Sequence, residues 1–492
     1  MRAEPRSSAT SDGHARSAAS GLRWIGSARA LTQILTWSMT LLTVRLLQPH
    51  DYGLIATAGI LTLFANLLLD GGLSLVLVSE RGLSGREYGA AFTWVLLVAA
   101  ALGVVIAAVA PVAAWFFRSP ALTRLLQVAA LQPPLWALLV VPQALLAREM
   151  RFRESALAQM LASVVQGATT LALAYSGAVY WALLLGTMTG TAVRAAAQLL
   201  FLRGGPAPNL HLGSLRPLWR KCAHMLGQRV VYFATSDFDI LMLGRLAGPA
   251  ALGSYSLAKT LAHTALDQVS GVVSQVSVPV FAGKGDDLRA QIEGLLLLIS
   301  TAAVLMFPLF WLTGVLAPAA LPLLFGARWA SLVLPFMAFA FVLPLRSVYT
   351  LLDSALVGTG RVSTTFRNML TWAAVMVPLL LVATHFGVKG AAGAWIIGFP
   401  IVFWLSMRRI ARVFAIGTRV LLRPLAAPLI WTAASGIIVE LAALILRHHL
   451  APLAQLVVEG AIAAACYWVL LRHFARPQYD QVLHMALRVM GR

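Results

Sequence analysis

Long apolar stretches recur along the whole chain and are separated by short polar connections. A helix that crosses the hydrocarbon core of a bilayer needs about 20 predominantly apolar residues, and most of the stretches reach that length. We therefore predict an all-α membrane protein with about 14 transmembrane helices. The predicted spans are residues 24–46, 53–78, 90–117, 123–146, 156–176, 180–202, 223–246, 252–281, 291–317, 330–357, 368–386, 390–407, 425–446 and 452–471.

The composition also indicates a membrane protein. The chain is 59% hydrophobic and 11% charged, whereas soluble domains are about 45–50% apolar and about 25% charged. The surplus of apolar residues has to face lipid, because a soluble core could not absorb it. Residues 1–20 contain no apolar run of the kind that a signal peptide needs, and we expect a disordered basic tail there.

The distribution of basic residues predicts the orientation of the chain. The formal net charge is +20, but the basic residues lie at the ends of apolar stretches rather than in one patch, so we expect no nucleic-acid partner. With the N-terminus in the cytoplasm, 26 of the 38 Lys and Arg residues fall in the tails and cytoplasmic connections, and five fall in the outer connections. Because Lys and Arg concentrate on the cytoplasmic side, we predict a multi-pass protein of the cell inner membrane with both termini in the cytoplasm.

The two halves of the chain contain an internal repeat. When the sequence is shifted by 200 residues, residues 41–80 align with 241–280 without a gap, and 12 of the 40 positions are identical. The identities include Arg45 with Arg245, one proline and two glycines, which apolar composition explains poorly. Six predicted spans separate the two copies, so both halves enter the membrane in the same orientation.

The repeat predicts two six-helix lobes that are related by an axis along the membrane normal, followed by two additional helices. The predicted organisation is a disordered cytoplasmic tail (1–21), an N-terminal six-helix lobe (22–203), a cytoplasmic linker (204–219), a C-terminal six-helix lobe (220–416), two additional helices (417–474) and a cytoplasmic tail (475–492).

Two segments of the repeat resemble a known family. Residues 45–73 (RLLQPHDYGLIATAGILTLFANLLLDGGL) and 237–262 (DFDILMLGRLAGPAALGSYSLAKTLA) are similar to the paired signatures of polysaccharide transporters of the flippase type. These belong with the multidrug/oligosaccharidyl-lipid/polysaccharide exporters, and the resemblance covers roughly residues 20–420. It implies two lobes enclosing a cavity, and the movement of an undecaprenyl-pyrophosphate-linked oligosaccharide to the outer leaflet by alternating access. The glycan would serve exopolysaccharide, capsule or lipopolysaccharide biosynthesis.

Basic residues within the spans are candidates for substrate binding. An intramembrane charge costs several kcal/mol unless it is paired or faces water. If their spans line the cleft, as in the resembled family, guanidinium groups there could bind pyrophosphate oxygens bidentately. The alternative is that the arginines at span ends extend to lipid headgroups. The candidates are Arg29, Arg45, Arg229, Arg245, Lys259 and Arg194.

Acidic residues in or near the spans are candidates for coupling transport to a proton or sodium gradient. Asp70 and Asp267 are preferred, and Asp267 shares a helical face with Lys259, which lies eight residues before it. The alternative is that these acids only neutralise neighbouring basic residues. The complete set of candidates is Asp70, Asp267, Asp237 and Asp239.

Several motifs of enzymes and ATP-driven pumps are absent from the sequence. The chain has no GxxxxGK[ST], HExxH or GxSxG motif, and neither Cys222 nor Cys466 has a CxxC or Cys/His partner. We therefore expect no cofactor or metal, and a transporter rather than an enzyme. A drug exporter of the same superfamily would require an acidic cavity, and a membrane glycan polymerase or ligase would require a large outer loop. The expected partners are the lipid-linked oligosaccharide and membrane lipids, with the polysaccharide polymerase and export machinery as further candidates.

The predicted topology can be tested with reporter fusions at Thr10 and Met485. Both fusions should be active when the reporter works only in the cytoplasm, because the basic residues hold both ends there. Activity of a periplasm-dependent reporter at either position would contradict the topology.

Overall fold

A computed structural model describes residues 36–80, 82–203, 206–215, 236–282, 287–446 and 451–476, with Gln33, Cys222, 226–227, 229–231, Phe233, Gln478 and Asp480, but not the side chains of Leu212, Ser214, 267–282 and Leu446. All regular elements in these ranges are helical, which confirms the predicted all-α class. Nine helical stretches of the described residues are long and apolar enough to cross a membrane. The number of 14 spans stays a prediction. The chain forms two compact units, Met1–Phe233 (unit 1) and Ala234–Arg492 (unit 2).

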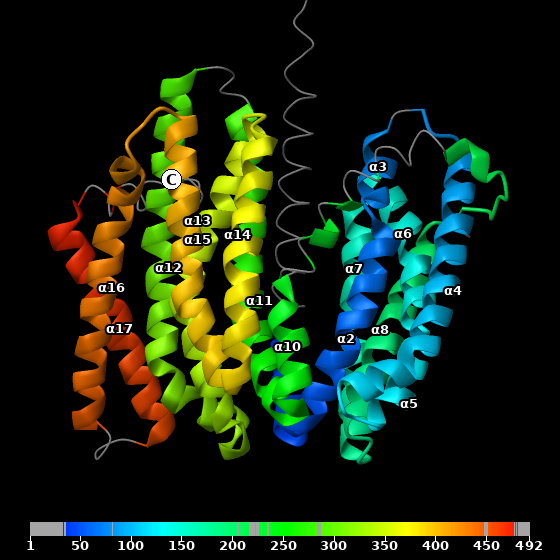
Figure 1. Ribbon diagram of the computed structural model, residues 1–492, viewed down its shortest axis with the longest axis horizontal. Coiled ribbons are helices and arrows are strands. Elements are labelled where there is room, and N and C mark those ends of the chain that lie inside the picture. The colour runs from blue at the N-terminus through cyan, green and yellow to red at the C-terminus, as the bar shows by residue number, and fades with distance from the viewer. Residues whose placement is uncertain are drawn as a thin grey trace, which may run out of the picture. The chain divides into compact units, whose positions relative to one another are not determined.

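Unit 1 is a bundle of helices (Figure 1). After a helical stretch at residues 36–46, it contains α2 (Pro49–Asp70), α3 (Leu73–Ser79), α4 (Gly85–Phe116), α5 (Ala121–Ala129), α6 (Gln132–Arg148), α7 (Phe152–Tyr175), α8 (Tyr180–Phe201) and the short helix η1 (Leu212–Leu215). α6 lies at the centre of the bundle, where it contacts α2, α3, α4, α7 and α8. Apolar helices form here because a helix satisfies its own backbone hydrogen bonds, which lipid cannot do.

Two spans that the sequence predicts as continuous are broken in unit 1. The predicted span 53–78 is divided at Gly71 and Gly72, whose φ angles of 44° and 90° lie in the left-handed region that glycine adopts readily. The predicted span 123–146 is divided between α5 and α6, just before two prolines that cannot donate backbone hydrogen bonds. The left-handed glycines turn the chain between α2 and α3, whereas Ala130 and Leu131 between α5 and α6 keep right-handed helical backbone angles.

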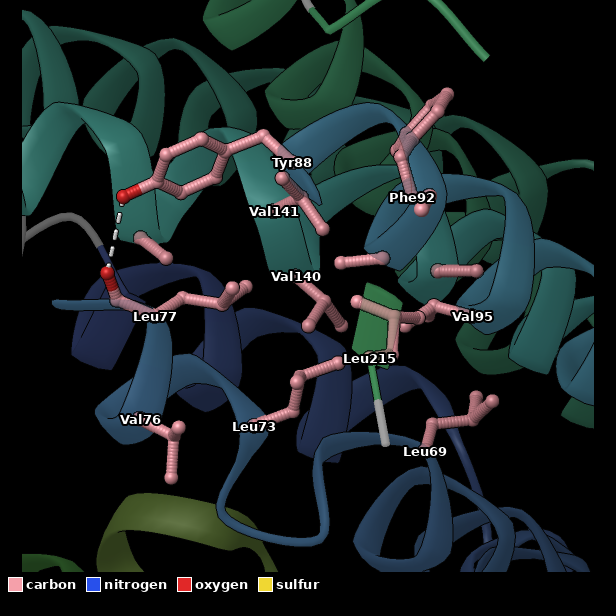
Figure 2. Close-up of a cluster of buried hydrophobic side chains, with 14 of the residues drawn as sticks. Leu69, Leu73, Val76, Leu77, Tyr88, Phe92, Val95, Val140, Val141 and Leu215 are labelled. Carbon is pink, nitrogen blue, oxygen red and sulfur yellow. Dashed lines mark hydrogen bonds between the residues drawn. The ribbon is translucent and has the colours of Figure 1, made fainter. Parts of the chain in front are cut away.

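Buried side chains from α2, α3, α4 and α6 form a core in unit 1, which Leu215 of η1 joins (Figure 2). The hydroxyl of Tyr88 donates to the carbonyl oxygen of Leu77 at 3.1 Å, which ties the start of α4 to α3. Arg148, at the end of α6, donates in turn to the Tyr88 hydroxyl. The broken span is therefore held in place at α3 by both packing and hydrogen bonds.

Unit 2 contains the remaining helices. They are α10 (Phe238–Leu246), α11 (Gly248–Ala282), α12 (Leu288–Phe325), η2 (Ala327–Leu332), α13 (Val333–Gly358), α14 (Val362–Ala383), η3 (Thr384–Phe386), α15 (Gly387–Val413), α16 (Thr418–Leu446) and α17 (Pro452–Phe474). α13 packs against α11, α12 and α15. The last two helices, orange and red in Figure 1, pack on each other and on α12.

The repeated segments have the same local structure at one point. In unit 1 two residues lie between the end of the helix at 36–46 and the start of α2 at Pro49. In unit 2 one residue lies between the end of α10 at Leu246 and the start of α11 at Gly248, which is next to Pro249. Proline suits the first turn of a helix, where its missing N–H has no helical partner to lose. The shared proline therefore marks a helix start in each unit.

Helix packing in unit 1 depends on Gly103 of α4, where a Cβ atom would lie 2.6 Å from the carbonyl oxygen of Ala130. Alanine there should displace the α5–α6 break and lower the free energy of unfolding by about 1–3 kcal/mol. Gly59 of α2 is the matched control, because a Cβ atom there would have no neighbouring atom within 4 Å. Gly59→Ala should leave thermal unfolding in nanodiscs unchanged or slightly raised. Equal melting temperatures for the two variants would contradict this packing.

Candidate functional site

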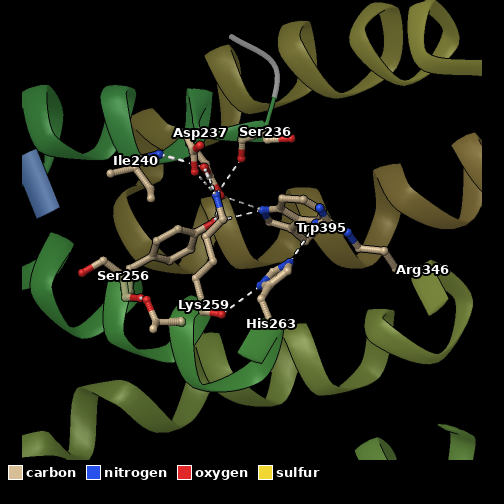
Figure 3. Close-up of polar contacts among 11 residues, drawn as sticks. Ser236, Asp237, Ile240, Ser256, Lys259, His263, Arg346 and Trp395 are labelled. Atoms are coloured by element: carbon tan, nitrogen blue, oxygen red, sulfur yellow. Dashed lines mark hydrogen bonds and ion pairs between the residues drawn. The ribbon is translucent and has the colours of Figure 1, made fainter. Parts of the chain in front are cut away.

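Unit 2 contains a buried cluster of charged and aromatic side chains that four helices build (Figure 3). Asp239 comes from α10, with Asp237 just before that helix begins, and Lys259 and His263 come from α11. Arg346 lies on α13, and α15 contributes Trp395, which Figure 3 shows beside His263. Tyr255, Lys259 and His263 are spaced by four residues, so they lie along one face of α11.

Asp239 is the acceptor at the centre of the cluster. Its side chain is fully buried, and its Oδ1 accepts from the Lys259 ammonium at 2.8 Å and from the Ile240 backbone N–H at 2.9 Å. Its Oδ2 accepts from the Tyr255 hydroxyl at 2.6 Å and from Trp395 Nε1 at 3.1 Å. Each oxygen of this carboxylate therefore accepts from two donors.

Lys259 is the cation of the cluster. Its Nζ donates to Asp239, to Asp237 Oδ1 at 3.1 Å and to the carbonyl oxygen of Ser236 at 2.6 Å. An ammonium group has three protons to donate, and three acceptors surround it here. Removing one partner of a buried pair costs about 3–5 kcal/mol, so this lysine ties α11 to the start of α10.

A second positive charge reaches the cluster through His263. Its Nδ1 lies 2.8 Å from the carbonyl oxygen of Lys259, and its Nε2 lies 2.8 Å from Arg346 NH1. Arginine can only donate, so Nε2 accepts and Nδ1–H donates to the carbonyl, which makes the imidazole neutral. The Arg346 guanidinium also lies over the Trp395 ring, 5.5 Å from its centre. The two cations Lys259 and Arg346 thereby balance the two carboxylates.

Unit 1 has a cavity of about 390 Å³ whose lining combines apolar and polar side chains. α2 and α3 supply one wall, α6 supplies the facing wall, and Arg229 also lines it. The lining residues are Asn66, Leu67, Asp70, Ser74, Trp136, Leu139, Val140, Gln143 and Arg229. The α6 members follow one another at intervals of one or three residues, so one face of that helix is turned towards the cavity.

Two hydrogen-bonded groups include polar residues of this lining. Asp70 pairs with Arg229 and also accepts from the Ser74 backbone N–H at 3.4 Å. Gln143 Oε1 accepts from Arg194 NH2 of α8 at 3.3 Å, so a second guanidinium contacts a residue of the lining. The structure thus places Arg194, Arg229 and Asp70, three of the candidates, in one part of unit 1.

The other candidates lie elsewhere. Arg45 is exposed at the end of the helix at 36–46, and Arg245 is half-buried in the last turn of α10. Arg29 and the side chain of Asp267 lie outside the described residues. Asp70 forms an ion pair with Arg229, and Asp237 and Asp239 form ion pairs with Lys259. These are pairs of the kind that the alternative of mutual neutralisation expects. A role of any candidate in transport stays a prediction.

Sequence reasoning did not select several residues of these two sites. Arg346 could have been chosen as an intramembrane charge, and Tyr255 by its four-residue spacing from Lys259. Trp136, Gln143 and Trp395 carry no comparable signal, because aromatic and amide residues are ordinary in membrane helices. These residues gain their contacts only because helices that are far apart in the sequence pack together.

Comparisons with known proteins agree with these features. The lipopolysaccharide biosynthesis protein WzxC of Escherichia coli is 24% identical over 78% of this chain and 78% of its own length. The succinoglycan biosynthesis transport protein ExoT of Rhizobium meliloti is 26% identical over 61% of this chain and 62% of its own. The structure of the lipid II flippase MurJ superposes with a TM-score of 0.74 over 92% of this chain and 99% of MurJ, at 12% identity, which shows a shared fold. The model of one family, described as polysaccharide biosynthesis protein, matches residues 42–334, and the chain therefore belongs to that family of membrane polysaccharide proteins.

Proposed function

We propose that this chain is a flippase that moves a lipid-linked oligosaccharide across the cell inner membrane for the synthesis of a cell-surface polysaccharide. Family membership and relatives named for lipopolysaccharide and succinoglycan synthesis support this substrate class. The fold shared with a lipid II flippase is suited to a lipid carrying a large polar head. On this proposal the chain is a transporter and catalyses no covalent change.

The observation that carries the proposal is the cavity of unit 1, which has charged and amide side chains in its lining and lies among helices that are apolar enough to cross a membrane. A sugar–pyrophosphate headgroup needs hydrogen-bonding partners on its way through hydrocarbon, while its prenyl tail can stay in lipid. Arg194 is the first candidate for the pyrophosphate, because its contact is to the neutral Gln143, whereas Arg229 pairs with Asp70. Guanidinium groups bind phosphate oxygens bidentately.

The finer architecture belongs to the same proposal. About 14 spans would form two six-helix lobes related by the parallel repeat, with two additional helices and both termini in the cytoplasm. Two compact units and the local match at the paired prolines support this arrangement. Parallel repeats around one cavity permit alternating access by rocking. A polysaccharide polymerase and export machinery would receive the glycan outside.

Export of a cationic drug is the second candidate function, and the cavity disfavours it. A cationic ligand would need an unpaired carboxylate, but Asp70 is paired with Arg229 and Arg194 adds a further positive charge. The described part of this cavity is therefore better suited to an anionic or neutral polar ligand.

Coupling to a proton or sodium gradient is assigned by this proposal to Asp237. Its side chain is 27% exposed and lies 3.1 Å from Lys259, whereas Asp239 is fully buried at 2.8 Å and has three further donors. A cation from solution can therefore compete with Lys259 at Asp237 more easily than at Asp239. Asp239 would hold the cluster together while Asp237 exchanges its cation.

The role of Arg194 can be tested by replacing it with glutamine and, separately, with lysine. Arg194→Gln should reduce glycan export about tenfold or more at unchanged membrane abundance, because hydrogen bonds to charged groups contribute about 1.5–3 kcal/mol. Glycan export by Arg194→Lys should lie between that of Arg194→Gln and that of the wild type, since lysine keeps the charge but not the planar donors. Exposed Arg124 of α5 provides the control variant Arg124→Gln, which should export normally. Normal export from Arg194→Gln would exclude this residue from substrate binding.

Coupling through Asp237 predicts different effects for two neighbouring acids. Asp237→Asn should fold, and its transport in proteoliposomes should no longer respond to an imposed proton or sodium gradient. Asp239→Asn should lower the free energy of unfolding by about 3 kcal/mol or more, because Lys259 loses its shortest carboxylate contact. Gradient-dependent transport by Asp237→Asn would rule out coupling at this residue.

A further inference from the structure

We propose that the cavity of unit 1 binds one sugar ring of the glycan, with the indole of Trp136 stacked against the ring and Asp70, Asn66 and Gln143 hydrogen-bonded to its hydroxyls. This inference rests on the proposed function, and it assigns the cavity to the sugar nearest the pyrophosphate. Arg194 would hold the pyrophosphate itself. Gln143 connects the two subsites, because it lines the cavity and accepts from Arg194.

The lining has the two kinds of side chain that a pyranose requires. One face of a pyranose presents C–H groups, which pack on an aromatic ring, while its edge presents hydroxyls that donate and accept. Trp136 is 39% exposed and lines the cavity on α6, and the carboxylate and amides of Asp70, Asn66 and Gln143 line it as well. The volume of about 390 Å³ lies near the lower end of ligand sites, about 300–1,000 Å³. It therefore suits a single residue of the glycan.

The charges distinguish a sugar from a phosphate in this cavity. Arg229 is paired with Asp70, so its charge is compensated where the cavity lies. A pyrophosphate placed there would meet the Asp70 carboxylate, which repels it. A neutral polyol meets both a carboxylate acceptor and a guanidinium donor, and it uses both. The anionic part of the substrate is better placed at Arg194, whose described contact is to an amide.

Polar atoms at the edge of the cavity lack protein partners. Asn66 Oδ1 and Arg194 Nε are both buried, and within the described part of the chain neither has a hydrogen bond. Buried polar atoms are nearly always hydrogen-bonded, so each unpaired atom calls for an explanation. Both atoms are covered in this conformation, so a shift of each side chain is needed before Asn66 can accept from a sugar hydroxyl and Arg194 can donate to a phosphate oxygen.

A second cavity in unit 1, of about 250 Å³, is a weaker candidate. Its lining includes several threonines, but three of these hydroxyls donate to carbonyl oxygens of their own helices at 2.8 Å: Thr40, Thr170 and Thr187. A hydroxyl that has already donated has only acceptor capacity left. The second cavity also has two amides, Gln159 and Gln166, but no charged side chain lines it, whereas Asp70 and Arg229 line the cavity beside Trp136.

Saturation-transfer NMR on the full chain in nanodiscs tests binding without transport. Methyl glycosides of glucose, galactose and N-acetylglucosamine serve as probes. We expect saturation of the C–H protons on one ring face of at least one glycoside, with affinity falling about threefold to tenfold in Trp136→Ala and largely retained in Trp136→Phe. Trp115→Ala is the matched control, because Trp115 is a 75% exposed tryptophan of the same unit. An excess of inorganic pyrophosphate should leave the signal unchanged.

Three binding results would overturn the sugar subsite: no saturation for any glycoside, equal signals in Trp136→Ala and Trp115→Ala, or displacement by pyrophosphate, which would make the cavity an anion site.

A transport assay separates failure of the sugar subsite from failure of the proposed function. In proteoliposomes, Trp136→Ala should slow movement of undecaprenyl pyrophosphate carrying one of these sugars but not of the bare lipid. If the wild-type chain moves a sugar-bearing lipid and Trp136→Ala does so equally well, the flippase proposal stands and the subsite is wrong. If the wild-type chain binds a glycoside yet moves no lipid, the subsite stands and the flippase proposal is wrong.

Discussion

A charged side chain among membrane-spanning helices costs several kcal/mol unless another group compensates it, and this requirement shapes both units. In unit 2 the ammonium of Lys259 is held between Asp237 and Asp239, and the second acid collects three further donors. These contacts fix how α10, α11 and α15 pack, because each helix supplies a partner that the others need. In unit 1 the same requirement joins Asp70 to Arg229.

Breaks in the helices decide where these charges lie. Asp70 is the last residue of α2, and Gly71 and Gly72 turn the chain before α3 begins. The turn lets the N–H of Ser74 reach the Asp70 carboxylate while α3 packs into the core beside α6. A continuous helix would have carried residues 73–79 in another direction. The glycines therefore create both the core of unit 1 and one wall of its cavity.

The two units differ chemically at positions that the offset of 200 residues aligns. Lys259 and Asp239 of unit 2 align with Gly59 and Met39 of unit 1, so these two charges have no counterpart at the aligned positions. In unit 2 the polar groups pair with one another, whereas in unit 1 the side chains of Asn66, Asp70 and Gln143 line a cavity. The two units therefore place their polar groups in different surroundings.

The sequence by itself determined that the chain is helical and suited to the membrane, because apolar runs of about 20 residues have few other stable structures in lipid. It also identified the repeat, and it marked Asp70, Arg194, Arg229, Asp237, Asp239 and Lys259 as charges that need partners. It could not say which partners, since those lie up to 159 positions apart, as Asp70 and Arg229 do. The tertiary structure alone decided that Lys259 meets two acids and that Arg194 meets an amide. It also placed Trp136, Tyr255 and Trp395 beside those charges. The neighbours of a side chain depend on how the helices pack, and a uniformly hydrophobic sequence does not indicate this packing.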